Sequence, residues 1–383
     1  MYKKSLAAVA VLGAFAANAM AADVTLYGVV DYGMQYKNQE VKTTHAGETT
    51  KKTTDALTLD SGVNAGSRFG IKATEDLGNG YKVSFKLENG FDADDGELGQ
   101  SGRLFGREAS LSVSSDWGTL SAGRMGAVTA AAGTYDFMAI VDAFDGGDGE
   151  INGLFGTSRM DNMLVYQSPK VAGLQLTAEY SFKADNKTKF ADPDQRDTEI
   201  ASAEGHKSAQ RYAGLALTGE YGPFQGLVAY EQVIQPDWVP AGAQFKDAKY
   251  VTVGGNYDCG FAKTFVTAQY LENVPYGAEE NEFGLINVVD TDALDGYALH
   301  LGTQFGIGAG TLTTGVYYND MTSDKDPEAS QKYIGGSVKY EYPLSVRTSL
   351  YSSVGYAKQK WESTGEDEKT SVTQAYFGIT HAF

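Results

Sequence analysis

The chain has 383 residues and a formal net charge of −18, with 24 Tyr, 18 Phe and 46 Gly but only 8 Pro. The acidic charge disfavours a nucleic-acid partner, because binding phosphates requires a basic face. The aromatic and glycine content is typical of strands and turns. The single cysteine, Cys259, excludes an internal disulfide and offers no metal or redox spacing, so no cofactor and no metal are expected.

The N-terminus has the three parts of a secretory signal peptide. Two lysines come first, residues 6–15 are apolar, and a small-x-small cleavage site ends at Ala21. The apolar stretch is too short for a transmembrane helix, which needs about 20 apolar residues. We therefore predict a signal peptide over 1–21 and a single mature domain over 22–383. Loss of the two lysines changes the net charge from −18 to −20.

From residue 23 onward, segments of about ten to fifteen residues alternate apolar and polar side chains. In 81–88, for example, Val83, Phe85 and Leu87 alternate with polar residues. No long apolar run follows the signal peptide, so a membrane protein of this sequence must be a closed barrel. The strands of a soluble sandwich also alternate apolar and polar side chains. The lengths of the connections are therefore needed to distinguish a barrel from a sandwich.

Seven short turns and eight long polar connections alternate strictly along the chain. Fifteen connections join sixteen strands, with both termini on the short-turn side. Outer-membrane barrels have this asymmetry, and sixteen strands leave an aqueous lumen. A sandwich has no reason to sort its loops by length. The long connections are 38–64, 92–102, 125–158, 184–208, 236–247, 273–293, 320–331 and 360–370.

Several stretches resemble the Gram-negative general porins of the neisserial and β-proteobacterial type. The most specific are residues 67–80, the second strand with its turn, and the terminal Phe383. The resemblance covers essentially the whole mature chain. The other matching stretches are 23–31, 105–107, 118–124, 164–169 and 378–383.

The resemblance implies an all-β fold, a 16-stranded antiparallel transmembrane β-barrel whose long third loop folds into the lumen. It implies an outer-membrane general diffusion porin, a homotrimer that passes ions and small hydrophilic solutes. Its other partners would be outer-membrane lipid and lipopolysaccharide. Phe383 would be the signal in the C-terminal strand that the barrel-assembly machinery reads.

The resemblance also implies a pore constriction with basic residues on the wall and acidic residues on the third loop, because rings of charge set the field in a pore. Alternation independently points Arg68, its neighbour Lys72, and Arg159 inward. The acidic candidates are Asp136, Asp142 and Asp145 on the third loop, with Glu88 on the wall as a weaker one.

Two further basic candidates, Arg107 and Arg124, conflict with alternation, which sends both side chains toward lipid. A lipid-facing Arg costs about 2–4 kcal/mol at the bilayer midplane. We therefore expect a rim position or a β-bulge at these residues, or Glu108 as the inward residue in place of Arg107.

Two alternatives to a general porin stay open. Aromatic residues in the third loop, Tyr135, Phe137 and Phe144, keep a substrate-specific channel, for example for sugars, in view. A barrel adhesin or enzyme is disfavoured, because the four histidines are scattered and no Gly-x-Ser-x-Gly motif appears. Ion selectivity is open as well: the charge of −20 favours cations, and clustered arginines favour anions.

Overall fold

The computed structural model describes residues 24–186, 204–207, 209–236, 246–275, 293–323 and 328–383. The predicted signal peptide over 1–21 lies outside these residues. Parts of four predicted loops also lie outside them: 184–208, 236–247, 273–293 and 320–331.

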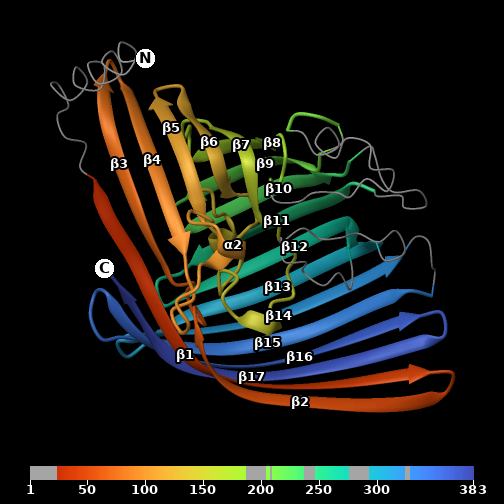
Figure 1. Ribbon diagram of the computed structural model, residues 1–383. Helices are drawn as coiled ribbons and strands as arrows, with labels where there is room; N and C mark the ends of the chain where they lie inside the picture. Colours follow the sequence, from red (N-terminus) through yellow and green to blue (C-terminus); the bar gives the residue numbers. More distant parts are fainter. Residues whose placement is uncertain (1–23, 187–203, 208, 237–245, 276–292, 324–327) are drawn as a thin grey trace, which may run out of the picture.

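One antiparallel sheet of seventeen strands accounts for most of the described chain (Figure 1). No helix in these residues has the length and apolar character needed to cross a bilayer. The strands are β1 (Thr25–His45), β2 (Glu48–Ser61), β3 (Arg68–Gly78), β4 (Tyr81–Gly90), β5 (Glu108–Ser115), β6 (Gly118–Gly126), β7 (Arg159–Gln167), β8 (Leu174–Ser181), β9 (Arg211–Tyr221), β10 (Phe224–Ile234), β11 (Ala248–Asp258), β12 (Ala262–Pro275), β13 (Ala293–Ile307), β14 (Gly310–Ser323), β15 (Ser330–Pro343), β16 (Thr348–Ser363) and β17 (Glu366–Ala382), and the short helical segments are α2 (Gly99–Gly102), α3 (Met138–Val141) and η1 (Gly149–Ile151).

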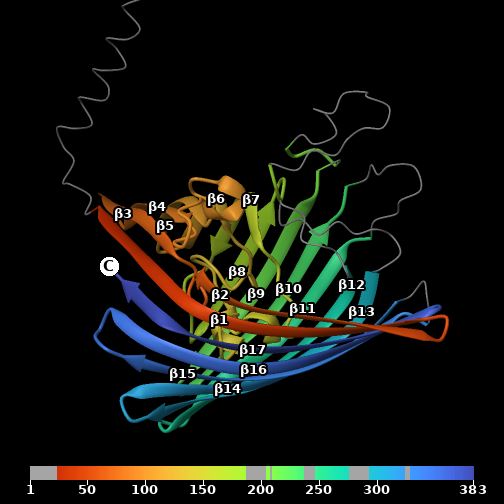
Figure 2. The same ribbon diagram turned by 60° about the horizontal axis from the view of Figure 1, so that its bottom comes forward.

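The sheet closes into a barrel at β1. This strand pairs with β17 on one side, and with β2 and then β3 on the other. At the end of the seam the Gly28 N–H donates to the Phe383 carbonyl at 3.1 Å, and the Phe383 N–H donates to the Gly28 carbonyl at 3.0 Å. Figures 1 and 2 both place the C-terminus beside β1. The predicted sixteen-stranded antiparallel barrel is confirmed, with β2 as one extra strand.

The extra strand corrects the prediction of a long loop over 38–64. There β1 continues to His45 and pairs with β2 through a two-residue turn at Ala46 and Gly47, both with positive φ, as in the tight turns that suit hairpins. Threonine is frequent in this stretch and its branched Cβ favours extended backbone. The predicted loop 360–370 is likewise a tight hairpin between β16 and β17. The polar composition of these two stretches predicted that they are exposed, but it did not reveal that they pair as regular strands.

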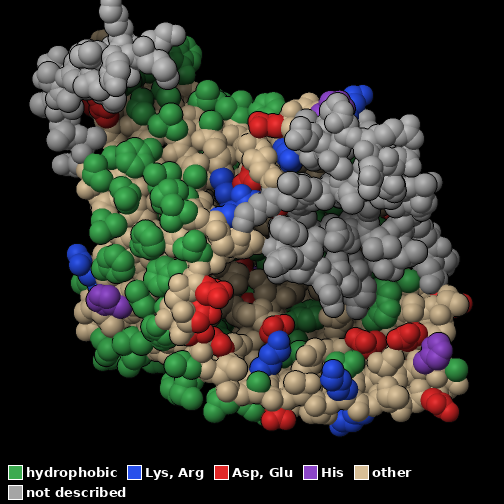
Figure 3. All heavy atoms as spheres, viewed as in Figure 1, with side chains coloured by type: hydrophobic (Ala, Val, Ile, Leu, Met, Phe, Trp, Pro, Cys, Tyr) green, Lys and Arg blue, Asp and Glu red, His purple; other side chains and the backbone are tan. Residues whose placement is uncertain are grey.

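The two faces of the sheet differ in the way expected of a barrel in lipid. One face carries exposed apolar side chains, such as Leu215, Val266 and Val316, each about half exposed. The alternate positions hold buried polar side chains such as Thr267 and Gln269. This arrangement is the reverse of a soluble protein and is typical of transmembrane barrels. Figure 3 shows apolar side chains gathered over the region of β1, β3 and β4.

Residues 127–158, between β6 and β7, pack against the polar face of the strands. Their backbone forms little regular structure, so its polar groups need partners from elsewhere. Side-chain amides of the strands supply them. The amides and their backbone partners are Asn256 with Ile140, Gln304 with Ala143, Gln374 with Asp148, Asn319 with Gly153 and Gln269 with Phe155.

Gln269 satisfies both backbone polar groups of one residue, Phe155. It donates to the Phe155 carbonyl at 2.7 Å and accepts from the Phe155 N–H at 2.8 Å, and it is 2% exposed. We predict that Gln269→Ala lowers the free energy of unfolding by about 2 kcal/mol, because two buried backbone groups lose their partner. Urea unfolding measures the change.

The control is Gln39→Ala, at a half-buried position of β1, which should change the free energy of unfolding by less than about 0.5 kcal/mol. Equal effects of the two substitutions would contradict a specific role for the Gln269 amide.

Candidate pore constriction

A cavity of about 510 Å³ lies between residues 131–149 and the barrel wall. The wall side consists of residues from β3, β4 and β7 and from the segments that precede β3 and β5. Seven of its lining side chains are charged. They are the basic Arg68, Lys86, Arg107 and Arg159 and the acidic Glu88, Asp136 and Asp145. Three of the predicted basic residues and three of the predicted acidic residues are therefore brought together at one place.

Two of the basic side chains are neutralised by carboxylates on the wall. Arg107 Nε lies 2.8 Å from Glu88 Oε1. Lys86 Nζ lies 2.8 Å from Glu108 Oε2 and 3.6 Å from Glu88 Oε2. The Tyr27 hydroxyl also donates to Glu88, at 2.8 Å. These ion pairs leave Arg107 and Lys86 with little net charge to offer a passing ion.

Arg68 and Arg159 differ from the other two. Within the described ranges neither forms an ion pair with a carboxylate. Arg68 Nη1 donates to the Gly66 carbonyl at 2.9 Å, and Arg159 Nε is buried with no hydrogen-bond partner. Guanidinium groups stay charged at all ordinary pH values. The cavity therefore holds two guanidinium groups that form no ion pair with any carboxylate of the described residues.

Arg107 reaches the cavity because it precedes Glu108, the first residue of β5, so strand alternation does not govern its direction. Glu108 also points inward, as the alternative expectation had it. It is 1% exposed and accepts a hydrogen bond from the Thr134 hydroxyl at 2.6 Å, which ties residues 127–158 to the wall.

Arg124 and Lys72 lie outside this lining. The register between β6 and β7 shifts between Gly123 and Met125, so the bulge expected at Arg124 is present. Arg124 Nη1 then lies 2.7 Å from Asp161 Oδ1, in a cluster that also contains Arg103. Lys72 lies on β3 with its Nζ 5.1 Å from the centre of the Tyr27 ring.

Asp142 is also outside the cavity, although it is on the predicted segment. It is 1% exposed. Its carboxylate accepts hydrogen bonds from the Tyr317 hydroxyl at 3.0 Å and from the backbone of Gly146 at 2.7 Å. His300 Nε2 lies 3.3 Å away. Asp142 therefore fastens its own segment to β13 and β14.

Asp145 is an exposed acidic residue of this segment that lines two cavities. It lines the cavity described above and a second one of about 560 Å³ that contains Lys339 and Glu341. Burial raises the pKa of Asp145 to about 7, and the neighbouring carboxyls of Asp136 and Asp142 add to the rise. Burial also raises the pKa of Asp136. Asn64 and Gly147 line both cavities too, so the two spaces meet at this point.

Three charged residues near the site were not singled out from the sequence. Lys86 shares a strand face with Glu88, so alternation could have found it. Lys339 lines the second cavity and its Nζ donates to Asn64 at 3.0 Å. Asp148 is 0% exposed, and neither carboxylate oxygen has a hydrogen-bond partner. Nothing in local sequence marks Lys339 or Asp148, because their positions depend on how residues 127–158 lie.

The chain matches the family model described as Gram-negative porin over residues 7–361. It is 30% identical to an outer membrane porin protein of Bordetella pertussis and 28% identical to outer membrane porin protein 32 of Delftia acidovorans, with all of each chain covered. Among solved structures, it is similar to an anion-selective porin from Comamonas acidovorans, with a TM-score of 0.61 and 24% identity over 95% of this chain and 100% of that one.

The buried Asp148 predicts a pH dependence of stability. Burial, and then the nearby Asp142, raise the pKa of Asp148 from 3.8 to about 7 in the folded chain. Between these values the folded protein keeps a proton that the unfolded chain has released, so stability falls as the pH rises toward 7. We predict that Asp148→Asn removes about 3 kcal/mol of this fall between pH 5 and pH 8, measured by urea unfolding at these two pH values.

Asp116→Asn, in an exposed short turn, is the matched control and should leave the pH dependence as it is. If Asp148→Asn and the wild type lose the same stability between pH 5 and pH 8, Asp148 is ionised in the folded protein and the prediction is wrong.

Proposed function

Because the chain belongs to the Gram-negative porin family, it is an outer-membrane β-barrel diffusion channel, and we propose that Arg68 and Arg159 set its ion preference. The observation that carries the proposal is a pair of unpaired guanidinium groups in a cavity whose other basic groups are neutralised. Fixed charge at the narrowest point of a pore decides which ions enter it.

We propose that residues 127–158 narrow the lumen and form one side of the constriction. Their hydrogen bonds to Asn256, Gln269, Asn319 and Gln374 support this, since those side chains belong to the polar face of four strands that run from β11 to β17. The segment thus contacts a large arc of the barrel wall. Asp136 and Asp145 on it face the arginines across the cavity.

The resulting constriction favours anions at short range. Two unpaired arginines face Asp136 and Asp145. Burial raises the pKa of both carboxyls, that of Asp145 to about 7, so the Asp145 carboxyl is only partly ionised near neutral pH. The overall charge of −18 acts from further away and is screened beyond about 8–10 Å at physiological salt. The local charges therefore dominate at the narrow point.

The substrate-specific alternative loses the feature that supported it. Tyr135, Phe137 and Phe144 are 3%, 9% and 4% exposed, because they pack between residues 127–158 and the wall. They do not present a continuous aromatic surface to a sugar. A passive channel for small hydrophilic solutes needs no such surface.

Further parts of the proposal come from the family. The protein would be exported through cleavage of residues 1–21 and would assemble as a homotrimer. Phe383 would be read by the barrel-assembly machinery. Its place in the closing seam with Gly28 is compatible with a late recognition step, when the last strand is inserted.

Planar-bilayer recording of the purified protein tests the channel. We predict stepwise openings in multiples of three, a conductance that rises linearly with salt, and no saturation by a single solute. Saturation by one class of solute would favour a substrate-specific channel, and a barrel without conductance would contradict the proposal.

Arg68→Ser and Arg159→Ser test the constriction. We predict that each substitution shifts the reversal potential in a salt gradient toward cations, and that the double substitution shifts it further, because each removes an unpaired positive charge from the cavity.

Arg347→Ser is the matched control, since Arg347 is exposed in the short turn between β15 and β16. It removes the same charge far from the cavity and should shift the reversal potential little. An unchanged reversal potential in both constriction variants would remove Arg68 and Arg159 from the selectivity site.

A further inference from the structure

Five lysines stand directly opposite one another across five neighbouring strands. Lys332 pairs with Lys360, Lys360 with Lys369, Lys369 with Lys42, and Lys42 with Lys51. We call these residues the lysine row. Like charges directly opposite in a sheet repel and destabilise it, so an uninterrupted row of five requires a reason.

The lysine row lies on the outward face of the barrel. Successive residues of a strand point to opposite faces. Tyr333 donates to the Ile151 carbonyl, and Gln374 donates to the Asp148 carbonyl, so both point toward residues 127–158. Lys332 is one residue from Tyr333 on β15, and Lys369 is five residues from Gln374 on β17. An odd separation places each lysine on the face opposite to its reference residue. Both lysines therefore point away from the lumen.

The height of the row places it at the edge of the apolar band. Leu350 is an exposed outward residue near the short-turn end of β16, and Lys360 lies ten residues further along this strand. At about 3.3 Å per residue and a tilt of about 40°, the rise is about 25 Å, the height of the apolar band of such barrels. Tyr356, 46% exposed, lies two residues before Lys358 on the same face of β16, nearer the short-turn end.

Tyr356 marks the interface more closely. Aromatic residues form girdles where the apolar band meets water, and Lys358 Nζ lies 5.5 Å from the centre of the Tyr356 ring. Lys358 is directly opposite Ser371, in the register next to the lysine row. Six lysines thus gather at the depth of lipid headgroups on the long-loop side.

Acidic neighbours offset only part of this charge. Glu40 lies 2.7 Å from Lys42 and 2.6 Å from Lys51. Asp320 lies 3.3 Å from Lys332, and Glu362 pairs with Lys360. In the part of the chain that the structure describes, Lys358 and Lys369 form no ion pair. Asp367, directly opposite Glu362, is a further carboxylate beside the row, and the six lysines exceed these four carboxylates by two charges.

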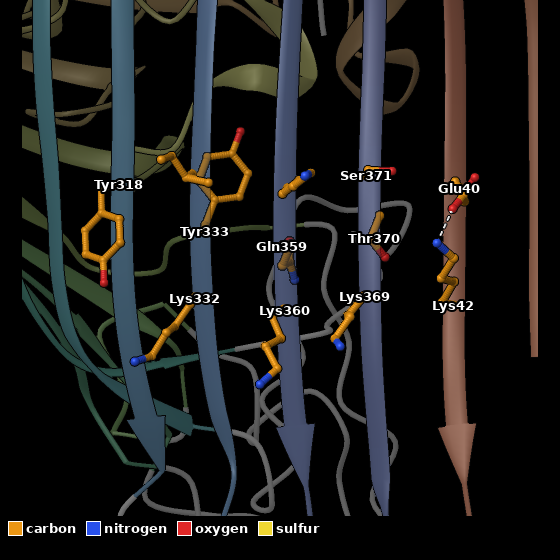
Figure 4. Close-up of a pocket in the computed structure, with 12 residues that line it drawn as sticks. Glu40, Lys42, Tyr318, Lys332, Tyr333, Gln359, Lys360, Lys369, Thr370 and Ser371 are labelled. Carbon is orange, nitrogen blue, oxygen red and sulfur yellow. Dashed lines mark ion pairs between the residues drawn. The ribbon is translucent and has the colours of Figure 1, made fainter. Parts of the chain in front are cut away.

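The row borders a shallow groove of about 400 Å³ that crosses β14 to β17 and β1. Figure 4 shows Lys332, Lys360 and Lys369 side by side at one height, with Lys42 and Glu40 on the neighbouring strand. Tyr318 and Ile334 give the groove an apolar side, and the lysines a cationic one. An amphiphile with an anionic head matches both sides.

We propose that the lysine row, with Lys358, binds the phosphate groups of a lipid headgroup in the leaflet on the long-loop side. The proposal rests on the outer-membrane location of the barrel and names the surface that contacts anionic lipid. Phosphate accepts charge-assisted hydrogen bonds from several ammonium groups at once, and it removes the repulsion between opposed lysines. Basic clusters of four to eight residues at a membrane surface are typical of anionic-lipid binding.

The test compares the wild type with the variant Lys42→Gln, Lys332→Gln, Lys360→Gln and Lys369→Gln, each purified as the native assembly in detergent. Microscale thermophoresis measures binding of diphosphorylated lipid A and of the same lipid without phosphates. The control variant carries Lys82→Gln, Lys170→Gln, Lys207→Gln and Lys246→Gln, four exposed lysines away from the row.

We expect the row variant to bind diphosphorylated lipid A at least tenfold more weakly than the wild type, while the control variant binds as the wild type does. The dephosphorylated lipid should bind all three proteins equally. Equal binding of the phosphorylated lipid by all three, or competition by inorganic phosphate alone at equal concentration, would overturn the proposal. So would a row variant whose only change is a loss of oligomeric assembly.

Single-channel conductance of the row variant separates this proposal from the channel function. It should equal the wild-type value, because the row lies outside the lumen. Weakened lipid binding with normal conductance supports the lipid site, and normal lipid binding with normal conductance rejects the site but leaves the channel intact.

Discussion

Every backbone N–H and C=O inside a bilayer must find a partner within the protein, and the seam between β1 and β17 meets this requirement. Without the seam both strands would be open edges in lipid. With it, the sheet has no edge, and each strand is free to present apolar side chains to lipid and polar side chains inward. The placement of charge in the lumen depends on this closure, because only a closed sheet encloses a lumen toward which alternate side chains point.

The same need for backbone partners shapes the interior. Residues 127–158 have few partners of their own, and the amides of the polar face supply them. These amides hold Asp136 and Asp145 across from Arg68 and Arg159. The electrostatics of the cavity are therefore a result of neutral hydrogen bonds some distance away.

The sixteen strands of the barrel could be predicted from alternation and turn spacing, because these are local properties. Alternation also directs Arg68 and Arg159 toward the cavity that both line. The direction of Arg107 could not be predicted in this way, since Arg107 lies just before a strand and its ion pair with Glu88 sets its direction. Asp142 is on the predicted segment, but docking against Tyr317 and His300 buries it. The regular hairpins within 38–64 and 360–370 were missed because both faces of the strands carry polar residues there, which hides the alternation.

The seam also joins segments far apart in the sequence, since Gly28 and Phe383 exchange backbone hydrogen bonds. The ring of Phe383 lies so close to Gly28 that a Cβ there would come within 2.3 Å of it. Contacts of such sequence separation form slowly, so the seam is expected to close late in folding. Until it closes, β1 and β17 each keep an unpaired edge that is prone to aggregate, so the rate of this one contact sets how long the folding barrel is exposed to that risk.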